Sequence, residues 1–196
     1  MVHMPAVPRI LAFAGSLRAD SYNKKLVQLA AAGARAAGAE VTCIDLRDYP
    51  LPIFDEDLER AEGLPANGRK LKDLFLAHDG LLISAPEYNS SISAVLKNTI
   101  DWVSRPAPGE EPLGCFAGKV AGLMAASPGA LGGLRGLVSV RMILGNIKVI
   151  VLPEQLAVAR AHEAFNPDGS LKDPAQQQAI QRIAADVTAT IRKLRA

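Results

Sequence analysis

The residues best suited to chemistry in this sequence lie in three short polar stretches, and the first of them predicts an anion site. It spans residues 15–23 and carries two hydroxyls, a guanidinium and an amide, those of Ser16, Ser21, Arg18 and Asn23. Free N–H groups at a helix start favour an anion, hydroxyl and amide groups add donors, and a planar guanidinium suits phosphate. The alternative is that Asp20 or Ser21 only caps the helix.

The second stretch, Pro86-Glu87-Tyr88-Asn89, suits a flat ring. Pro86 stiffens the loop, and Tyr88 offers a flat aromatic face. Backbone amides and the Asn89 side chain can reach the edge of a planar heterocycle. The alternative is an ordinary turn between a strand and a helix.

The third stretch, residues 127–136, contains Ser127 and a cluster of glycines that includes Gly129 and Gly132. Glycines let the backbone come close to a ligand and turn its N–H groups outward. A simple sharp turn would explain the same glycines, so this stretch is informative only beside the other two.

Each polar stretch follows a short apolar run of the kind that forms a strand buried on both faces of a parallel sheet. Five such strands are predicted, over residues 9–14, 40–46, 81–83, 119–126 and 148–152. Helical spacing of apolar residues recurs between the strands and after the last, in residues 26–37, 71–78, 92–103 and 180–194.

This alternation predicts an α/β protein with a three-layer, doubly wound, five-stranded parallel sheet. In the strand order 2-1-3-4-5 the first and third strands are neighbours at the switch point, so their loops flank one crevice. A loop for phosphate beside a loop for a flat ring describes a mononucleotide such as FMN. The first loop has neither GxxxxGK[ST] nor GxGxxG, which argues against a P-loop and against a dinucleotide fingerprint.

Length and composition predict a single domain over residues 1–196, with residues 1–8 as a disordered N-terminal arm. The formal net charge is +2 with acids and bases interspersed, so no nucleic-acid partner is expected. No run approaches the ~20 apolar residues of a membrane span, and the first five residues lack the features of a signal peptide. Cys43 and Cys115, without a CxxC motif, are expected to be reduced thiols of a cytoplasmic protein.

No side chain stands out as a catalytic acid, base or nucleophile. His3, His78 and His162 are isolated from any Ser–His–Asp spacing. The acidic triplet at residues 55–57 has no His or Cys nearby, which favours a solvated face over a metal site. We therefore predict no catalytic side chain and no metal ligand.

Two further segments are predicted to have roles at the protein surface. The long irregular segment 47–64 could cover a pocket with its apolar half. Residues 137–144 are apolar on more than one side, which indicates a subunit interface.

Taken together, these motifs resemble the NADPH-dependent FMN reductase family, which includes flavin, quinone, azo-dye and chromate reductases. The resemblance runs from about residue 10 to residue 154, and it rests on Gly15-Ser16-Leu17-Arg18 with Ser21 and Asn23, on Pro86-Glu87-Tyr88-Asn89 with Leu96-Lys97-Asn98 and Ile100-Asp101-Trp102, and on Ser127 with Gly132-Gly133 and Arg135. It implies a flavodoxin-like fold, FMN as cofactor, NADPH or NADH as electron donor, and a homodimer or homotetramer with the flavin near the interface.

The resemblance also implies roles for individual residues. The FMN phosphate would be held by Ser16, Arg18, Ser21 and Asn23. The isoalloxazine ring would be lined by Pro86, Glu87, Tyr88 and Asn89, and its far side closed by Ser127, Gly129 and Gly132.

Two positions depart from the family pattern. The family usually has Pro where this chain has Ser93, and this is expected to loosen the start of the following helix. A polar or aromatic residue is often found where Val138 stands, which weakens the implied interface network of Arg135 and Glu154.

The expected function is two-electron, ping-pong reduction, in which NAD(P)H reduces the flavin and a flavin, quinone, azo compound or metal oxyanion then accepts the electrons. The rivals are a one-electron carrier like flavodoxin, although such carriers are typically acidic, and a flavin-binding regulator. The sequence leaves open the physiological acceptor and whether FMN is a prosthetic group or a substrate. The cation that would read the 2′-phosphate of NADPH is equally open, between Arg18, Arg105, Arg135 and a neighbouring subunit.

Overall fold

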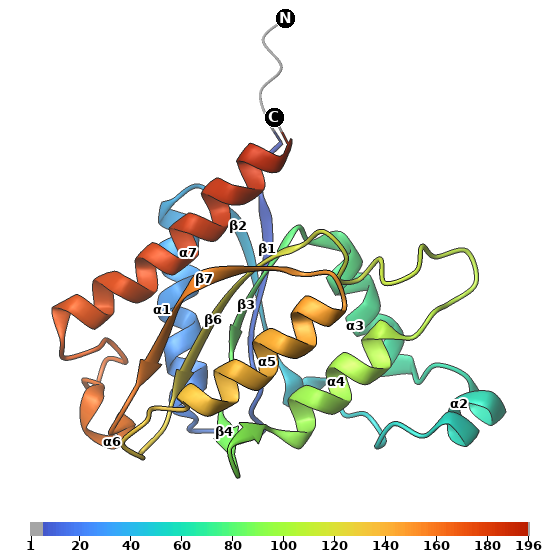
Figure 1. Ribbon diagram of the computed structural model, residues 1–196, viewed down its shortest axis with the longest axis horizontal. Helices are drawn as coiled ribbons and strands as arrows, with labels where there is room; N and C mark the ends of the chain where they lie inside the picture. Colours follow the sequence, from blue (N-terminus) through green and yellow to red (C-terminus); the bar gives the residue numbers. More distant parts are fainter. Residues whose placement is uncertain (1–5, 196) are drawn as a thin grey trace, which may run out of the picture.

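The computed structural model describes residues 6–195, and its centre is a parallel sheet of five strands (Figure 1). The strands of this sheet, in chain order, are β1 (Arg9–Ala14), β2 (Glu40–Asp45), β3 (Gly80–Ser84), β6 (Val120–Ala126) and β7 (Ile150–Val158). They lie in the order β2-β1-β3-β6-β7, and every adjacent pair is parallel. This is the predicted order 2-1-3-4-5, so the doubly wound, flavodoxin-like fold class is confirmed.

Strand β7 is longer than predicted. The prediction ended at Leu152 because Pro153 and the polar residues after it interrupt the apolar run. In the structure the pairing with β6 continues past a register shift and reaches Val158. An edge strand such as β7 tolerates both a proline and a bulge, since one of its sides has no partner strand. The extension brings the residues after Val158 to the carboxyl edge of the sheet, where the three polar stretches also lie.

Helices cover both faces of the sheet (Figure 1). The longer helices are α1 (Tyr22–Ala36), α3 (Ala66–Ala77), α4 (Ala94–Ser104), α5 (Leu134–Asn146) and α7 (Pro174–Arg195). Helices α1 and α7 pack together on one face, where Val27 and Val187 belong to the same apolar core. Helices α3, α4 and α5 cover the other face, where Phe75 and Val140 belong to a second core. The sheet therefore separates two cores.

Several short elements were not predicted as regular structure. They are the 3₁₀-helix η1 (Leu46–Asp48), α2 (Glu56–Glu62), β4 (Glu87–Tyr88), β5 (Ser91–Ile92) and α6 (Ala161–Ala164). The acidic triplet 55–57 begins α2, because the Asp55 carboxylate accepts hydrogen bonds from the N–H groups of Asp57 (2.7 Å) and Leu58 (3.3 Å) and so caps the helix. The β4–β5 hairpin takes the place of the loop predicted after β3.

Most of the N-terminal arm predicted over residues 1–8 lies outside the described residues. Pro8, at its end, is buried, and its carbonyl accepts a hydrogen bond of 2.9 Å from the N–H of Glu40. Within residues 6–195, none of the helices combines the length and the apolar character that crossing a bilayer requires.

Candidate functional site

The three polar stretches meet at the carboxyl edge of the sheet, around a small hollow of about 110 Å³. Parallel strands end at the same edge, so loops far apart in the sequence come together there. The predicted site residues that line the hollow are Ser16, Arg18, Ser21, Asn23, Pro86, Glu87, Tyr88 and Ser127. Three others, Asn89, Gly129 and Gly132, do not line it.

The loop between β1 and α1 presents donors that the protein does not use itself. Ser21 stands at the N-cap of α1, yet its hydroxyl makes no capping hydrogen bond. The Arg18 side chain is exposed and forms no ion pair within residues 6–195. Asp20, the one carboxylate of the loop, is bound to Lys25 at 2.9 Å. The alternative that Asp20 or Ser21 caps the helix with its side chain is therefore wrong, and the Arg18 guanidinium and the Ser21 hydroxyl have no protein partner in the described chain.

The Asn23 side chain ties three elements together at the floor of the site. Its Oδ1 accepts hydrogen bonds from the Ser84 hydroxyl (2.9 Å) and the Ala126 N–H (3.0 Å). Its Nδ2 donates to the Ala126 carbonyl at 2.8 Å, which leaves one N–H for a ligand. All three residues are buried, so these bonds fix the start of α1 against the ends of β3 and β6. Ser84, which directly follows the apolar run 81–83, is not among the site residues predicted from the sequence.

Ser93 fixes the start of α4 instead of loosening it. Its buried hydroxyl accepts a hydrogen bond from the N–H of Leu96 (3.3 Å), which caps the helix, and donates to the carbonyl of Gly15 (2.6 Å). The expectation drawn from the missing proline is therefore wrong, because a serine at an N-cap satisfies a backbone donor. The second bond joins the first loop to the element that follows the second loop. Gly15 also packs tightly, since a Cβ there would lie 2.9 Å from Cβ of Leu96.

Residues 87–92 form a hairpin, β4 and β5, that projects from the carboxyl edge (Figure 1). Its two-residue turn consists of Asn89 and Ser90, with φ of 51° and 66°. Two successive left-handed residues make a type I′ turn, whose twist matches that of the strands. The Tyr88 side chain is exposed, as the prediction of an available aromatic face requires. Asn89 lies at the tip of the turn, beyond the hollow.

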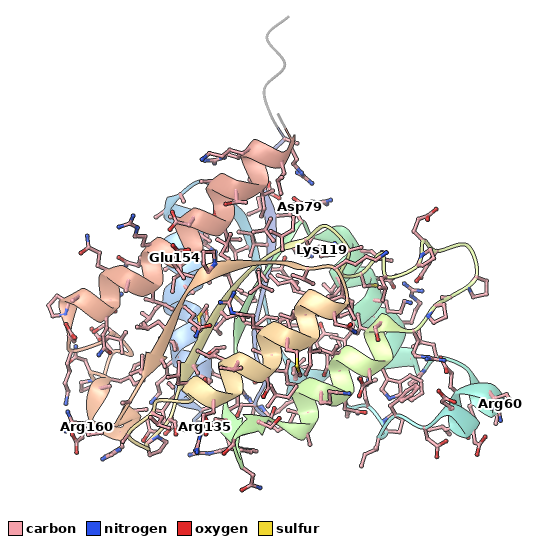
Figure 2. All side chains as sticks on the ribbon, in the orientation of Figure 1. Arg60, Asp79, Lys119, Arg135, Glu154 and Arg160 are labelled. Carbon is pink, nitrogen blue, oxygen red and sulfur yellow. The ribbon has the colours of Figure 1, made fainter. Side chains whose placement is uncertain are left out.

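Glu87 joins this hairpin to α5. Its Oε2 accepts hydrogen bonds from the N–H groups of Arg135 (2.9 Å) and Gly136 (3.1 Å), and its Oε1 binds the Arg135 guanidinium. Burial raises the pKa of this carboxyl, but the hydrogen bonds from Gly136 and Arg135 outweigh burial and hold the pKa below its ordinary value. Arg135 therefore has its partner within the chain. Glu154, with which the resemblance groups Arg135, lies well apart from it (Figure 2) and lines a separate hollow with residues of β7 and α7.

The glycine-rich loop after β6 is shaped mainly by backbone packing. Gly132 has φ of 63°, and a Cβ there would lie 2.7 Å from the backbone nitrogen of Ala159. Only glycine fits such a contact, whether or not a ligand is present. Gly129 is exposed, and its N–H donates to the Ser127 hydroxyl at 3.2 Å. Of the three residues predicted from this stretch, only Ser127 borders the hollow.

Sequence reasoning missed three lining residues, Tyr22, Ala126 and Pro128. The Tyr22 ring stacks on Phe165, with centroids 5.9 Å apart and planes 13° from parallel. Tyr22 lies between two predicted site residues, Ser21 and Asn23, and this position could have identified it as a lining residue. Nothing in the sequence connects it to Phe165, which follows α6.

A second hollow, of about 260 Å³, lies on the other side of the first loop. The long segment after β2 forms one wall of it, as predicted, and α4 forms another. Asn98 of α4 holds this segment by accepting from the Phe54 N–H and donating to the Pro52 carbonyl, both at 2.8 Å. Trp102 is fully buried and its Nε1 also donates to the Pro52 carbonyl at 2.8 Å, so its role here is in packing.

Comparison with known proteins agrees with this geometry. The sequence profile of the NADPH-dependent FMN reductase family matches residues 8–163, and these include all three loops. The chain belongs to this family. An NAD(P)H-dependent FMN reductase of Pseudomonas aeruginosa is 34% identical over 188 residues, which cover 95% of this chain and 97% of that protein. A quinone reductase of Pseudomonas putida is 32% identical over 187 residues, or 93% of this chain and 96% of that protein.

The fold is also similar to that of a flavoenzyme whose structure has been solved. The flavoenzyme FerB of Paracoccus denitrificans, an NAD(P)H:(acceptor) oxidoreductase, superposes with a TM-score of 0.80 at 28% identity, over 95% of this chain and 98% of that one. As an NADPH-dependent FMN reductase by family, the protein is an oxidoreductase that uses FMN, with NAD(P)H as electron donor.

Proposed function

We propose that the protein binds FMN at the hollow on the carboxyl edge, with the phosphate at the start of α1. The observation that supports this most directly is the set of unused donors there, the hydroxyls of Ser16 and Ser21 and the Arg18 guanidinium. The two nearby carboxylates, Asp20 and Glu87, are both bound to other groups, so neither opposes a phosphate. Donors at a helix start without a competing negative charge are what phosphate requires.

We assign the remaining predicted residues to the flavin ring. In this proposal Asn23 positions the phosphate loop and offers its remaining side-chain N–H to the phosphate. The flavin ring is lined by Pro86, Glu87, Tyr88 and Asn89, and its far side is closed by Ser127, Gly129 and Gly132. The hollow, about 110 Å³, is smaller than the roughly 300–1,000 Å³ of typical ligand sites. It therefore suits the phosphate end, and we place the ring at the open surface beside the hairpin, where substrates can reach it.

The proposed reaction is two-electron, ping-pong transfer from NAD(P)H to a small-molecule acceptor. Bound FMN supplies the hydride chemistry, and the protein supplies position and access. Donor and acceptor would use the same exposed face in turn. Backbone N–H groups near Tyr88 and Asn89 would offset negative charge that develops on the ring. Among acceptors we favour quinones because of the quinone reductase relative, with flavins, azo compounds and metal oxyanions as alternatives.

We further propose that this chain by itself discriminates weakly between NADPH and NADH. Arg105 is paired with Glu59 at 2.8 Å, and Arg135 is paired with Glu87 at 2.7 Å. Arg18 is the cation assigned to the FMN phosphate. No candidate for the 2′-phosphate then remains among the three, so we expect the kcat/KM ratio for the two donors to lie within about tenfold. A ratio far above this would indicate a 2′-phosphate site that a second subunit provides.

We propose a homodimer formed through α5, with a homotetramer as the larger alternative. Leu134, Val138 and Met142 follow one another at helical spacing on α5, and their side chains are 43%, 63% and 69% exposed. Such an apolar stripe on a surface helix suits a second copy of the same face. The stripe begins beside Arg135, so the interface would adjoin the hairpin. We also propose one domain and a cytoplasmic location, the latter because both cysteines are free thiols.

An absorbance spectrum of the purified protein, followed by anaerobic addition of NADPH, tests the proposed function. We expect bound flavin whose band bleaches in one step with one equivalent of NADPH. Accumulation of a separate long-wavelength band during the titration would instead indicate a one-electron carrier. A protein without flavin that cannot be reconstituted with FMN would contradict the assignment of the three loops.

A further inference from the structure

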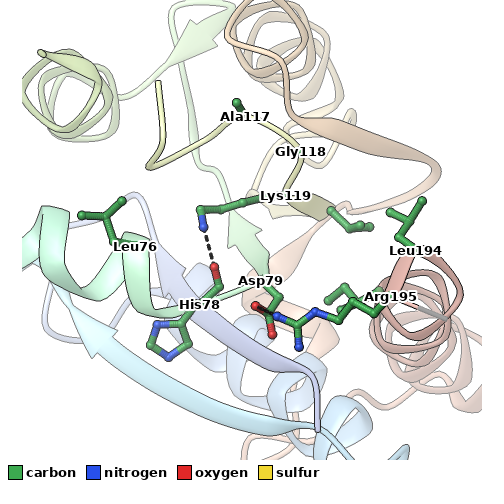
Figure 3. A pocket seen from close by; sticks show the side chains of 10 residues that line it. Leu76, His78, Asp79, Ala117, Gly118, Lys119, Leu194 and Arg195 are labelled. Carbon is green, nitrogen blue, oxygen red and sulfur yellow. Dashed lines mark hydrogen bonds and ion pairs between the residues drawn. The ribbon is translucent and has the colours of Figure 1, made fainter. Parts of the chain in front are cut away.

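A third hollow lies at the opposite edge of the sheet, where β3 and β6 begin (Figure 3). Figure 2 shows Lys119 and Asp79 at this edge, and Arg135 and Arg160 at the edge of the flavin site. The hollow has a volume of about 300 Å³, which reaches the lower end of the range typical for small-molecule sites. Its walls come from the end of α3, the turn before β6 and the end of α7.

Lys119 contributes a charged group without a carboxylate partner to this hollow. The residue is only 8% exposed, and its Nζ donates one hydrogen bond, of 2.5 Å, to the carbonyl of His78 (Figure 3). No carboxylate lies within ion-pair distance of Nζ in the part of the chain that the structure describes. Two of the three ammonium N–H groups are therefore left for a ligand. A buried ammonium with so few partners is unfavourable, and burial accordingly lowers the pKa of Lys119.

The neighbouring polar groups already have partners within the protein. The Asp79 carboxylate accepts a hydrogen bond of 2.8 Å from the Arg9 N–H and pairs with the Arg195 guanidinium. The His78 ring is turned away, toward the Leu74 carbonyl and the Thr42 hydroxyl. Lys119 is thus the cation of this hollow whose charge no carboxylate of the described chain neutralises, and the Asp79–Arg195 pair beside it adds no net charge.

We infer that this hollow is a second binding site, for a small organic monocarboxylate with an apolar tail, whose carboxylate Lys119 binds. One uncompensated ammonium matches one negative charge better than it matches a phosphate dianion. Leu76 and Leu194, 41% and 59% exposed, stand at the margin of the hollow with Ile191, and they provide apolar contact for the tail. Because the site is at the far edge of the sheet from the flavin, its ligand is distinct from the electron acceptor.

Calorimetric titration of the FMN-loaded protein with benzoate tests this site. We expect saturable binding at one site, weakened at least about tenfold by Lys119→Met, since a hydrogen bond to a charged group is lost. Lys148→Met removes the same charge from an exposed position at the same edge and should leave the affinity unchanged. Benzyl alcohol, which lacks the charge, and inorganic phosphate, which lacks the tail, should each bind more weakly than benzoate.

A second measurement keeps the test independent of how Lys119→Met folds. In the wild-type protein, benzoate should slow acetylation of Lys119 by acetic anhydride, read by mass spectrometry, and leave acetylation of Lys148 unaffected. Equal benzoate affinity in the folded Lys119→Met variant, absence of saturable binding, or unchanged acetylation would overturn the inference. Benzoate that displaces FMN would also overturn it. Reduction of the flavin by NADPH is measured separately, so failure here leaves the proposed function untouched.

Discussion

At the scale of single residues, the site depends on which side chains are left without a partner inside the protein. Two side chains of the first loop are available. The Ser21 hydroxyl makes no capping hydrogen bond, and the Arg18 guanidinium forms no ion pair in the described chain. The side chains of Asn23 and Ser93, by contrast, already make most of the hydrogen bonds available to them with neighbouring backbone groups and, for Asn23, with the Ser84 hydroxyl. The first pair is therefore suited to bind, and the second pair to position what binds.

Replacing Arg18 by alanine should weaken FMN binding by roughly ten- to a hundredfold, because a charge-assisted hydrogen bond to the phosphate is lost. Riboflavin, which lacks the phosphate, serves as the matched ligand and should bind the variant and the wild type equally. Both affinities can be read from quenching of flavin fluorescence. Parallel losses for FMN and riboflavin would show that Arg18 does not contact the phosphate.

Replacing Ser93 by alanine removes the N-cap of α4 and leaves the Gly15 carbonyl without its hydroxyl donor. We expect the free energy of unfolding to fall by about 1–3 kcal/mol and FMN affinity to fall as well, since the phosphate loop loses its attachment. Ser104→Ala, at the other end of the same helix, is the control. Urea denaturation and flavin titration measure the two effects. Unchanged FMN affinity in Ser93→Ala would limit Ser93 to a stabilising role.

At the scale of elements, the hairpin of β4 and β5 is held by α5 more than by the sheet. Glu87 is the link, because its side chain is 8% exposed and accepts hydrogen bonds from the first turn of α5. A carboxylate at a helix N-terminus is also favoured by the helix dipole. The position of Tyr88 in the site consequently depends on α5, a helix that begins almost fifty residues later in the chain.

Glu87→Gln should destabilise the protein at neutral pH by about 1–2 kcal/mol, since a charge-assisted hydrogen bond becomes a neutral one. The folded pKa of Glu87 is lowered, so the stability from its charge is complete above the unfolded pKa, about 4.3, and is lost as pH falls through the folded value. The difference between variant and wild type should therefore shrink below about pH 4. Chemical denaturation at several pH values measures it, with Glu62→Gln, an exposed position, as control. A difference independent of pH would contradict this assignment.

At the scale of the whole molecule, the exposed stripe of α5 lies next to the proposed ring site. The same helix binds Glu87 at its first turn and presents Val138 and Met142 to the surface. An assembly through α5 would place a second copy beside the hairpin, where donor and acceptor have to enter.

Val138→Asp should convert the proposed dimer to a monomer, because burying an unpaired carboxylate in an apolar interface is strongly unfavourable. The fold should persist, since the side chain is 63% exposed in the single chain. Light scattering coupled to size exclusion gives the mass. The control is Ile53→Asp, at a position 85% exposed and far from α5 in the sequence. A wild-type protein that is monomeric, or a variant that remains dimeric, would exclude this interface.

Much of the fold was determined by the sequence alone. The five apolar runs, the helical spacing between them and the handedness of parallel connections predict a doubly wound parallel sheet, whose loops meet at one edge. The flavodoxin-like strand order agrees with what the resemblance to the FMN reductase family implied. The proposal of Ser16, Arg18 and Ser21 as phosphate donors also rests on local pattern, since a helix start after a strand is a local event, and all three line the hollow at the carboxyl edge.

The tertiary structure, by contrast, determines which hydrogen-bond or ion-pair partner each polar side chain has. Glu87 binds a residue 48 positions away, Ser93 one 78 positions away, and Asn23 one 103 positions away. No periodicity encodes such pairs, because they depend on how strand ends and loops meet in space. For the same reason, three features could be recognised only in the folded chain: the hairpin turn, the extension of β7 past Pro153, and a Lys119 ammonium without a carboxylate partner among residues 6–195. The local pattern of apolar and polar residues determines where helices and strands form. Burial on folding determines which polar atoms must form hydrogen bonds with one another.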